Sequence, residues 1–234
     1  RRRLFAALAW ARRAALWGGR AVVAAAAASV LWVGAYAFWD PPGTWLIERE
    51  RARLGAVAHQ WTAIDALPAH VPLSMIAAED ANFCAHFGVD WTALRAAIME
   101  WRMGEALRGA STISQQTAIN VFLWPDRSFL RKGLELWFTL WIEAFWSKRR
   151  ILEVYLNVAE FGEGAFGVEA GARAAFARPA AELSRRQAAR LAAVLPAPRD
   201  RDPAALQGFV PERAASIAAG AGLLVQEARV ACLE

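Results

Sequence analysis

Glu79 and Asp80 stand at the end of an apolar run, MIAA, and are the first candidates for chemistry in this sequence. A carboxylate at the edge of an apolar helix is desolvated, so its pKa rises toward the range used in acid–base catalysis. Ordinary surface or capping acids would explain the same pair without any chemistry. His86 follows in the same segment, but a single histidine is more often structural than a metal ligand. Three histidines and two separated cysteines show no spacing typical of a metal site.

A second carboxylate, Glu135, follows a group of cations formed by Arg127, Arg131 and Lys132. Arg131 and Glu135 are four residues apart and would pair on the surface of a helix, which is the simpler interpretation. The functional interpretation is a cationic site beside an acid. Residues 148–150 add three cations at the start of a predicted helix, where the helix dipole disfavours positive charge. Their placement indicates a purpose other than helix stability.

The polar stretch GASTISQQTAIN, residues 109–120, interrupts an otherwise apolar chain. Thr112 and Gln115 fit a capping box that opens a helix. The free N–H groups of that first turn, with the hydroxyls and amides around them, would bind an anion. The alternative is a capped helix with solvent-facing polar side chains. That alternative leaves three residues unexplained: Ser111, Ser114 and Gln116.

These features together suggest displacement at a sugar carbon with a phosphate-type leaving group. One glutamate would take the proton from an attacking hydroxyl. The cations and the helix start would hold the departing pyrophosphate.

Residues 21–39 carry no charge and would form a helix about 28 Å long, close to the ~30 Å hydrocarbon core of a membrane. The first 20 residues carry six arginines and no acid, whereas the rest of the chain has 21 basic against 22 acidic residues. We therefore expect a cytoplasmic tail, a C-terminal bulk on the outer side, and no nucleic-acid surface.

Residues 35–37 (AYA) could be a signal-peptide cleavage site, but the apolar run exceeds the roughly 7–15 residues of such peptides, which favours an uncleaved anchor.

Helical patterns recur through the rest of the chain, whereas alternating strand patterns are hard to find, so we expect a mostly α fold. Asp90 and Ser147 are expected N-caps, and Ser184 with Gln187 is expected to form a second capping box. The segment from Gln207 onward is expected to be helical, with no chemistry assigned to it.

The chain has two cysteines, Cys84 and Cys232. An oxidising compartment would permit a bridge, but two cysteines so far apart do not define a disulfide framework. We therefore expect two unpaired thiols.

The chain resembles the monofunctional biosynthetic peptidoglycan glycosyltransferases (transglycosylases), the stand-alone form of the polymerase domain of class A penicillin-binding proteins. The resemblance runs from about Leu73 to Pro198 and rests on five motifs in order: EDANFCAHFGVDW, GASTISQQ, RKGLE, KRRILEVYLN and GEGAFGVEAGA. It implies a mostly helical, lysozyme-like catalytic domain with a jaw region near the membrane. With the anchor, the expected division is a cytoplasmic basic tail (1–20), a transmembrane anchor (21–39), a linker and jaw-proximal segment (40–72), a catalytic region (73–200) and a C-terminal helical extension (201–234).

The resemblance implies a polymerase of lipid II at the bacterial inner membrane, with its catalytic domain in the periplasm. The growing chain would move from undecaprenyl pyrophosphate to the 4-hydroxyl of lipid II, forming a β-1,4 link with inversion. Glu79 matches the catalytic base and Glu135 the second glutamate, which assists near the pyrophosphate or the acceptor. The implied substrate-binding residues are Asp80, Phe83, His86, Ser111, Thr112, Gln115, Gln116, Asn120, Arg127, Arg131, Lys132, Lys148, Arg150 and Asn157.

No tightly bound cofactor is implied, although a divalent cation, Mg²⁺ or Mn²⁺, is common near the pyrophosphate in such enzymes. Nothing in the sequence identifies its ligands. The implied partners are lipid II, the undecaprenyl-linked glycan chain and the membrane, with cell-division or wall-synthesis proteins as further candidates. The sequence has no Ser-x-x-Lys or Lys-Thr-Gly motif, so we expect no transpeptidase activity.

One departure from the family pattern is Ile119, which stands where a phosphate-contacting Lys is expected. Loss of a hydrogen bond to a charged group is worth roughly 1.5–3 kcal/mol, so turnover could fall about ten- to a hundredfold or more unless an Arg substitutes. The first alternative function is therefore a weak or inactive membrane scaffold of the same fold. The second is a lysozyme-like glycan-cleaving enzyme, against which the clustered cations argue.

Overall fold

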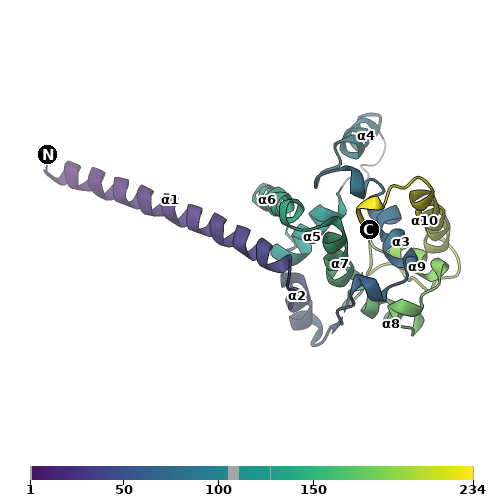
Figure 1. The fold of residues 1–234 in the computed structure, drawn as a ribbon. Coiled ribbons are helices and arrows are strands. Elements are labelled where there is room, and N and C mark those ends of the chain that lie inside the picture. Colours follow the sequence, from purple (N-terminus) through teal and green to yellow (C-terminus); the bar gives the residue numbers. More distant parts are fainter. Residues whose placement is uncertain (1, 105–110, 127, 234) are drawn as a thin grey trace.

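The computed structural model describes residues 2–104, 111–126 and 128–233 of the 234-residue chain. A long N-terminal helix, α1 (Arg2–Tyr36), extends away from a domain built of shorter helices (Figure 1). The 25 residues from Arg12 to Tyr36 form a helix long and apolar enough to cross a membrane. This agrees with the expected anchor, although the helix starts well before residue 21 and ends at Tyr36.

The last turns of α1 pack into the domain. Val33 is fully buried, and its carbonyl oxygen accepts a hydrogen bond from Trp146 Nε1 at 2.9 Å. The ring of Trp32 meets that of Phe122 edge-on, with centroids 5.0 Å apart. The end of α1 is therefore part of the domain's core, which restricts how the domain can be oriented relative to this helix.

The prediction of a mostly α fold is confirmed. Helices α5, α6 and α7 pack together, and α3, α9 and α10 form a second group (Figure 1). The helices of the domain are α2 (Trp45–Leu54), α3 (His70–Glu79), α4 (Trp91–Arg102), α5 (Ile113–Phe122), α6 (Phe129–Phe145), α7 (Lys148–Val158), α8 (Val168–Phe176), α9 (Arg185–Ala193) and α10 (Phe209–Gln226). Short 3₁₀ helices connect them: η1 (Ile64–Ala66), η2 (Phe83–Ala85), η3 (Ala180–Glu182) and η4 (Ala231–Leu233).

A small sheet was not expected from the sequence. Its strands are β1 (Ala58–His59), β2 (Glu160–Gly162) and β3 (Ala165–Phe166), in the order β1-β3-β2. β1 runs parallel to β3, and β2 runs antiparallel to it. Strands of two or three residues are too short to show an alternating pattern. Residues 40–72, expected as linker and jaw-proximal segment, thus contain α2, β1 and η1 as folded elements.

Polar caps set the starts of the helices. A cap side chain accepts a hydrogen bond from a first-turn N–H group that has no partner within the helix. The predicted caps all form: Asp90 on α4, Thr112 with Gln115 on α5, Ser147 on α7, and Ser184 with Gln187 on α9.

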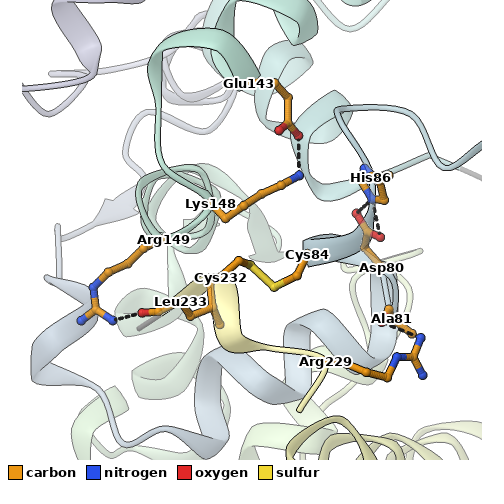
Figure 2. Close-up of a disulfide and its surroundings, with 10 residues drawn as sticks. All are labelled: Asp80, Ala81, Cys84, His86, Glu143, Lys148, Arg149, Arg229, Cys232 and Leu233. Carbon is orange, nitrogen blue, oxygen red and sulfur yellow. Dashed lines mark hydrogen bonds and ion pairs between the residues drawn. A yellow bond between two sulfur atoms is a disulfide. The ribbon is translucent and has the colours of Figure 1, made fainter. Parts of the chain in front are cut away.

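The expectation of two unpaired thiols is wrong, because Cys84 and Cys232 form a disulfide (Figure 2). Cys84 lies in η2 and Cys232 in η4, with their Cα atoms 5.6 Å apart and a sequence separation of 148. The pairing depends on how the chain returns after α10, which cysteine spacing does not encode. In the chain-entropy view, closing so long a loop destabilises the unfolded chain by about 5 kcal/mol.

Gly171 allows α8 to pack closely on residues outside it. A Cβ atom at this position would lie 2.5 Å from the Cβ of Phe161 and 3.3 Å from Cδ1 of Leu191. We predict that Gly171→Ala lowers the free energy of unfolding by about 1–3 kcal/mol through overpacking. Gly222→Ala on α10 is the matched control, because a Cβ there meets nothing within 4 Å. Thermal unfolding followed by circular dichroism measures both variants, and equal midpoints would contradict this account of α8.

Candidate active site

Glu79, the last residue of α3, is half-buried where three helices meet. Its Oε2 accepts a hydrogen bond from Nε2 of Gln116, on α5, at 2.8 Å. Gln116 Oε1 in turn accepts from the hydroxyl of Tyr155, on α7, at 3.3 Å. Burial raises the pKa of Tyr155 well above its usual value, so the phenol stays protonated and able to donate. The carboxylate is thus held by a relay of two side chains.

The pKa of Glu79 is raised, chiefly by burial. The hydrogen bond from Gln116 and the charge of Arg213 oppose the rise, the negative charge of Asp80 adds to it, and Arg201 opposes it. A carboxylate with a raised pKa is a stronger base than one in water. This environment is the one that the sequence predicts for a residue that accepts a proton.

Asp80 joins the end of α3 to the start of α5. It is buried, with His86 Nε2 2.9 Å from its Oδ1, and its Oδ2 accepts from the backbone N–H of Ile113 at 3.0 Å. The capping box takes the N–H groups of Thr112 and Gln115. These three N–H groups already have protein acceptors, so they do not form the anion site expected at this helix start.

A buried cluster around Glu143 explains two more of the predicted residues. Glu143 Oε1 accepts from Ser114 Oγ at 2.5 Å. It also accepts from Lys148 Nζ at 2.7 Å, as Figure 2 shows. Lys148 Nζ also lies 4.6 Å from the centroid of the buried Phe83 ring. Glu143 therefore joins α6 to α5 through Ser114 and to the start of α7 through Lys148. Glu143 itself was not predicted, although it lies eight residues after Glu135 and so on the same face of α6.

Glu135 is almost fully buried, with an exposed fraction of 1%. Arg131 Nη1 donates to its Oε2 at 3.1 Å, and Lys132 Nζ donates to its Oε1 at 2.5 Å. The pair predicted at a spacing of four residues therefore exists, but its acid lies in the interior. The second glutamate and the two cations form one ion-paired unit.

Two predicted substrate-binding residues make contacts within the protein. Arg150 donates to the carbonyl oxygen of Tyr36 at 3.1 Å and to Asp40 at 2.8 Å, which fixes the end of α1. Asn157 is fully buried, and its amide bonds the backbone N–H and carbonyl of Thr62 at 2.7 and 2.9 Å. Of the others, Ser111 is exposed, Asn120 is half-buried on α5, and Arg127 lies outside the described residues.

Tyr155 and Arg213 lie beside Glu79 but were not predicted as site residues. Tyr155 falls in the KRRILEVYLN motif on the buried face of α7, where helical periodicity directs it inward. Arg213, on α10, donates to the carbonyl oxygen of Ala78 at 3.2 Å. No local pattern indicates that contact, because it joins residues 135 positions apart.

A family profile described as Transglycosylase matches residues 48–221. This chain belongs to the transglycosylase family. The biosynthetic peptidoglycan transglycosylase of Rhodospirillum centenum is 47% identical over 225 residues, which cover 95% of this chain and 94% of that protein. The protein of the same name from Jannaschia sp. is 48% identical over 216 residues, 92% of this chain and 89% of the relative. That from Marinomonas sp. is 54% identical over 157 residues, 67% of this chain and 70% of the relative.

The predicted family and enzyme class are thereby confirmed. The family match also extends beyond the Leu73–Pro198 region at both ends, and it includes Arg213.

We predict that Gln116→Leu shifts the acid limb of the pH profile of kcat/KM to higher pH. The substitution removes a hydrogen bond that lowers the pKa of Glu79, so a higher pH is needed to ionise the base. Gln226→Leu, at an exposed position at the end of α10, is the matched control and should leave the limb unchanged. An acid limb at the wild-type pH or below it in Gln116→Leu would refute the assigned hydrogen bond.

Proposed function

We propose that this chain polymerises peptidoglycan glycan strands from lipid II, with Glu79 as the catalytic base. The main support is a half-buried carboxylate with a raised pKa, held by Gln116, in a chain of the transglycosylase family. Relatives that align with most of its length are named biosynthetic peptidoglycan transglycosylases.

In the proposed reaction, Glu79 removes the proton from the 4-hydroxyl of the acceptor lipid II. The resulting oxygen nucleophile attacks C1 of the donor sugar, so the C1–O4 bond forms while the bond from C1 to the pyrophosphate oxygen breaks. The electron pair leaves with undecaprenyl pyrophosphate, and the α-linked donor becomes a β-1,4 link with inversion. Glu79 then holds the proton.

Arg131 and Lys132 are the proposed cations for the leaving group. Together with Ser128 and Phe129 they line a surface hollow. The side chain of Lys132 is 49% exposed, whereas that of Arg131 is 14% exposed. Lys132 can therefore turn from Glu135 to a bound phosphate while Arg131 keeps the glutamate paired. Charge-assisted bonds to the departing pyrophosphate would stabilise the transition state.

The membrane-facing features support a lipid-linked substrate. Trp137 on α6 donates from Nε1 to Ser29 Oγ on α1 at 3.0 Å, so α6 lies beside the anchor (Figure 1). α6 also exposes a set of large apolar side chains: Phe129, Leu130, Leu136 and Leu140. We place the chain in the bacterial inner membrane as a single-pass protein, with its catalytic domain in the periplasm. The disulfide suits that oxidising compartment.

A protein-held divalent cation does not fit the part of the chain that the structure describes. No group of three or more His, Cys, Asp or Glu side chains there could hold a metal ion.

Glu79→Gln is predicted to lower the rate of polymerisation by about 10²–10⁴-fold, because the amide cannot accept the proton. The measurement is the glycan ladder that detergent-solubilised full-length protein makes from labelled lipid II. Glu182→Gln, at an exposed position in η3, is the matched control and should retain the ladder. A full ladder from Glu79→Gln would remove Glu79 from the reaction, and shortening of finished strands would favour the glycan-cleaving alternative.

Ile119→Lys tests whether the departure from the family pattern limits turnover. Ile119 is half-buried on α5, three residues after Gln116 and so on the same helix face. A lysine there would add a charge-assisted bond to phosphate, and we predict a turnover higher by about ten- to a hundredfold. Val225→Lys, on the exposed side of α10, is the control for added charge.

Equal turnover of Ile119→Lys and an active wild type would mean that the isoleucine is tolerated. A ladder made by the variant alone would mean that the phosphate site of the wild type no longer supports polymerisation, which favours the scaffold alternative.

A further inference from the structure

We propose that residues 227–233, which follow α10, form a positioning clamp on the loop that continues from the catalytic carboxylate. Its two attachment points are Arg229 and the Cys84–Cys232 disulfide. The inference rests on the proposed role of Glu79, and it assigns a purpose to the part of the chain for which the sequence predicted none.

The attachments fall within four residues of each other, directly after Glu79 and Asp80. Arg229 Nη2 donates to the carbonyl oxygen of Ala81 at 2.9 Å and also to Oδ1 of Asn82. Figure 2 shows Arg229 reaching toward Ala81, and Asp80 beside His86, all on the same side of the disulfide. Two independent bonds, one covalent, therefore hold the same short loop.

The clamp is itself fixed to the body of the domain. Ala228 has a φ of 53°, in the left-handed region that residues other than glycine rarely adopt, and it turns the chain away from the end of α10. At the other end of the segment, Arg149 of α7 donates to the carbonyl oxygen of Leu233 at 2.9 Å (Figure 2). A segment anchored to both α10 and α7 can hold a loop at a set distance from them.

Holding this loop affects Glu79 in two ways. It sets where α3 ends, and so where the carboxylate meets Gln116. It also keeps the carboxylate buried, and burial is the main cause of its raised pKa. The groups that face Glu79 are Gln116 from α5, Tyr155 of α7 through Gln116, Asp80 from the loop, Arg213 from α10, and Arg201.

Releasing the loop would admit water without removing any of these groups. The pKa of Glu79 would then fall, and the acid limb of the rate profile would move to lower pH.

The test compares oxidised wild type, Cys84→Ala/Cys232→Ala and Arg229→Ala as full-length protein in detergent, polymerising labelled lipid II. We expect both variants to show a kcat lower by about 10- to 100-fold, an acid limb at lower pH, and a KM unchanged within about twofold. Arg229→Lys keeps a donor for the Ala81 carbonyl and should recover part of the loss. Arg186→Ala, at an exposed position on α9, is the matched control with wild-type values.

Dithiothreitol offers a second route to the same state, because it reduces the bond to two thiols while its own sulfurs form a cyclic disulfide. It should lower the kcat of the wild type and leave the double cysteine variant unchanged. All rates are measured well below each variant's unfolding midpoint. If the cysteine variant does not fold, Arg229→Ala and the reduced wild type decide the question.

Variants that lose stability but keep the wild-type kcat and acid limb would overturn the proposal, since the disulfide would then be only a crosslink. If oxidised wild type makes no glycan, the proposed function fails and the clamp is judged by hydrogen exchange of residues 80–86. Faster exchange in the reduced protein supports the clamp, and unchanged exchange overturns it.

Discussion

The structure depends on the burial of one carboxylate among three helices. Removing Glu79 from water is unfavourable unless a hydrogen-bond donor replaces the lost solvent, and Gln116 supplies that donor at 2.8 Å. Tyr155 orients the amide of Gln116, so α3, α5 and α7 must keep their relative positions for the relay to exist. The same burial that raises the pKa of the carboxylate requires this packing. The raised pKa of Glu79 and the packing of α3, α5 and α7 therefore depend on the same contacts.

Several charged side chains bond the backbone groups that are left without partners at helix ends. Asp80 accepts the N–H of Ile113 at the positive start of α5, whereas Arg213 donates to the carbonyl of Ala78 at the negative end of α3. Arg150 does the same for α1 through the carbonyl of Tyr36. Asp80 and Arg150, which lie in two of the five motifs, thus stabilise helix ends. The carboxylate of Asp80 thus takes the place of the bound anion that was expected at the start of α5.

Local patterns predicted the caps and the helices, because their signals lie within a few residues of each other. Thr112 and Gln115 are three positions apart, and both partners of that capping box are visible in the sequence. The disulfide is different, because Cys84 and Cys232 meet only after α10 has packed on α3 and the chain has turned back. The position of Arg213 beside Glu79 was not predicted either, because it too depends on the packing of α10 on α3. Contacts between residues far apart in sequence result from tertiary packing, and the spacing of residues along the chain does not predict them.

The disulfide offsets an energetic cost of the site. A carboxylate whose folded pKa is raised stabilises the fold only while it is protonated, and that contribution is lost as the pH rises through the folded pKa. Ionisation of Glu79 above that pKa therefore removes a contribution to the stability of the domain. A cross-link between Cys84 and Cys232 offsets such a cost by restricting the unfolded chain, by about 5 kcal/mol in the chain-entropy view. The cross-link therefore stabilises the fold as a whole, although it lies in the loop that follows Glu79 and Asp80.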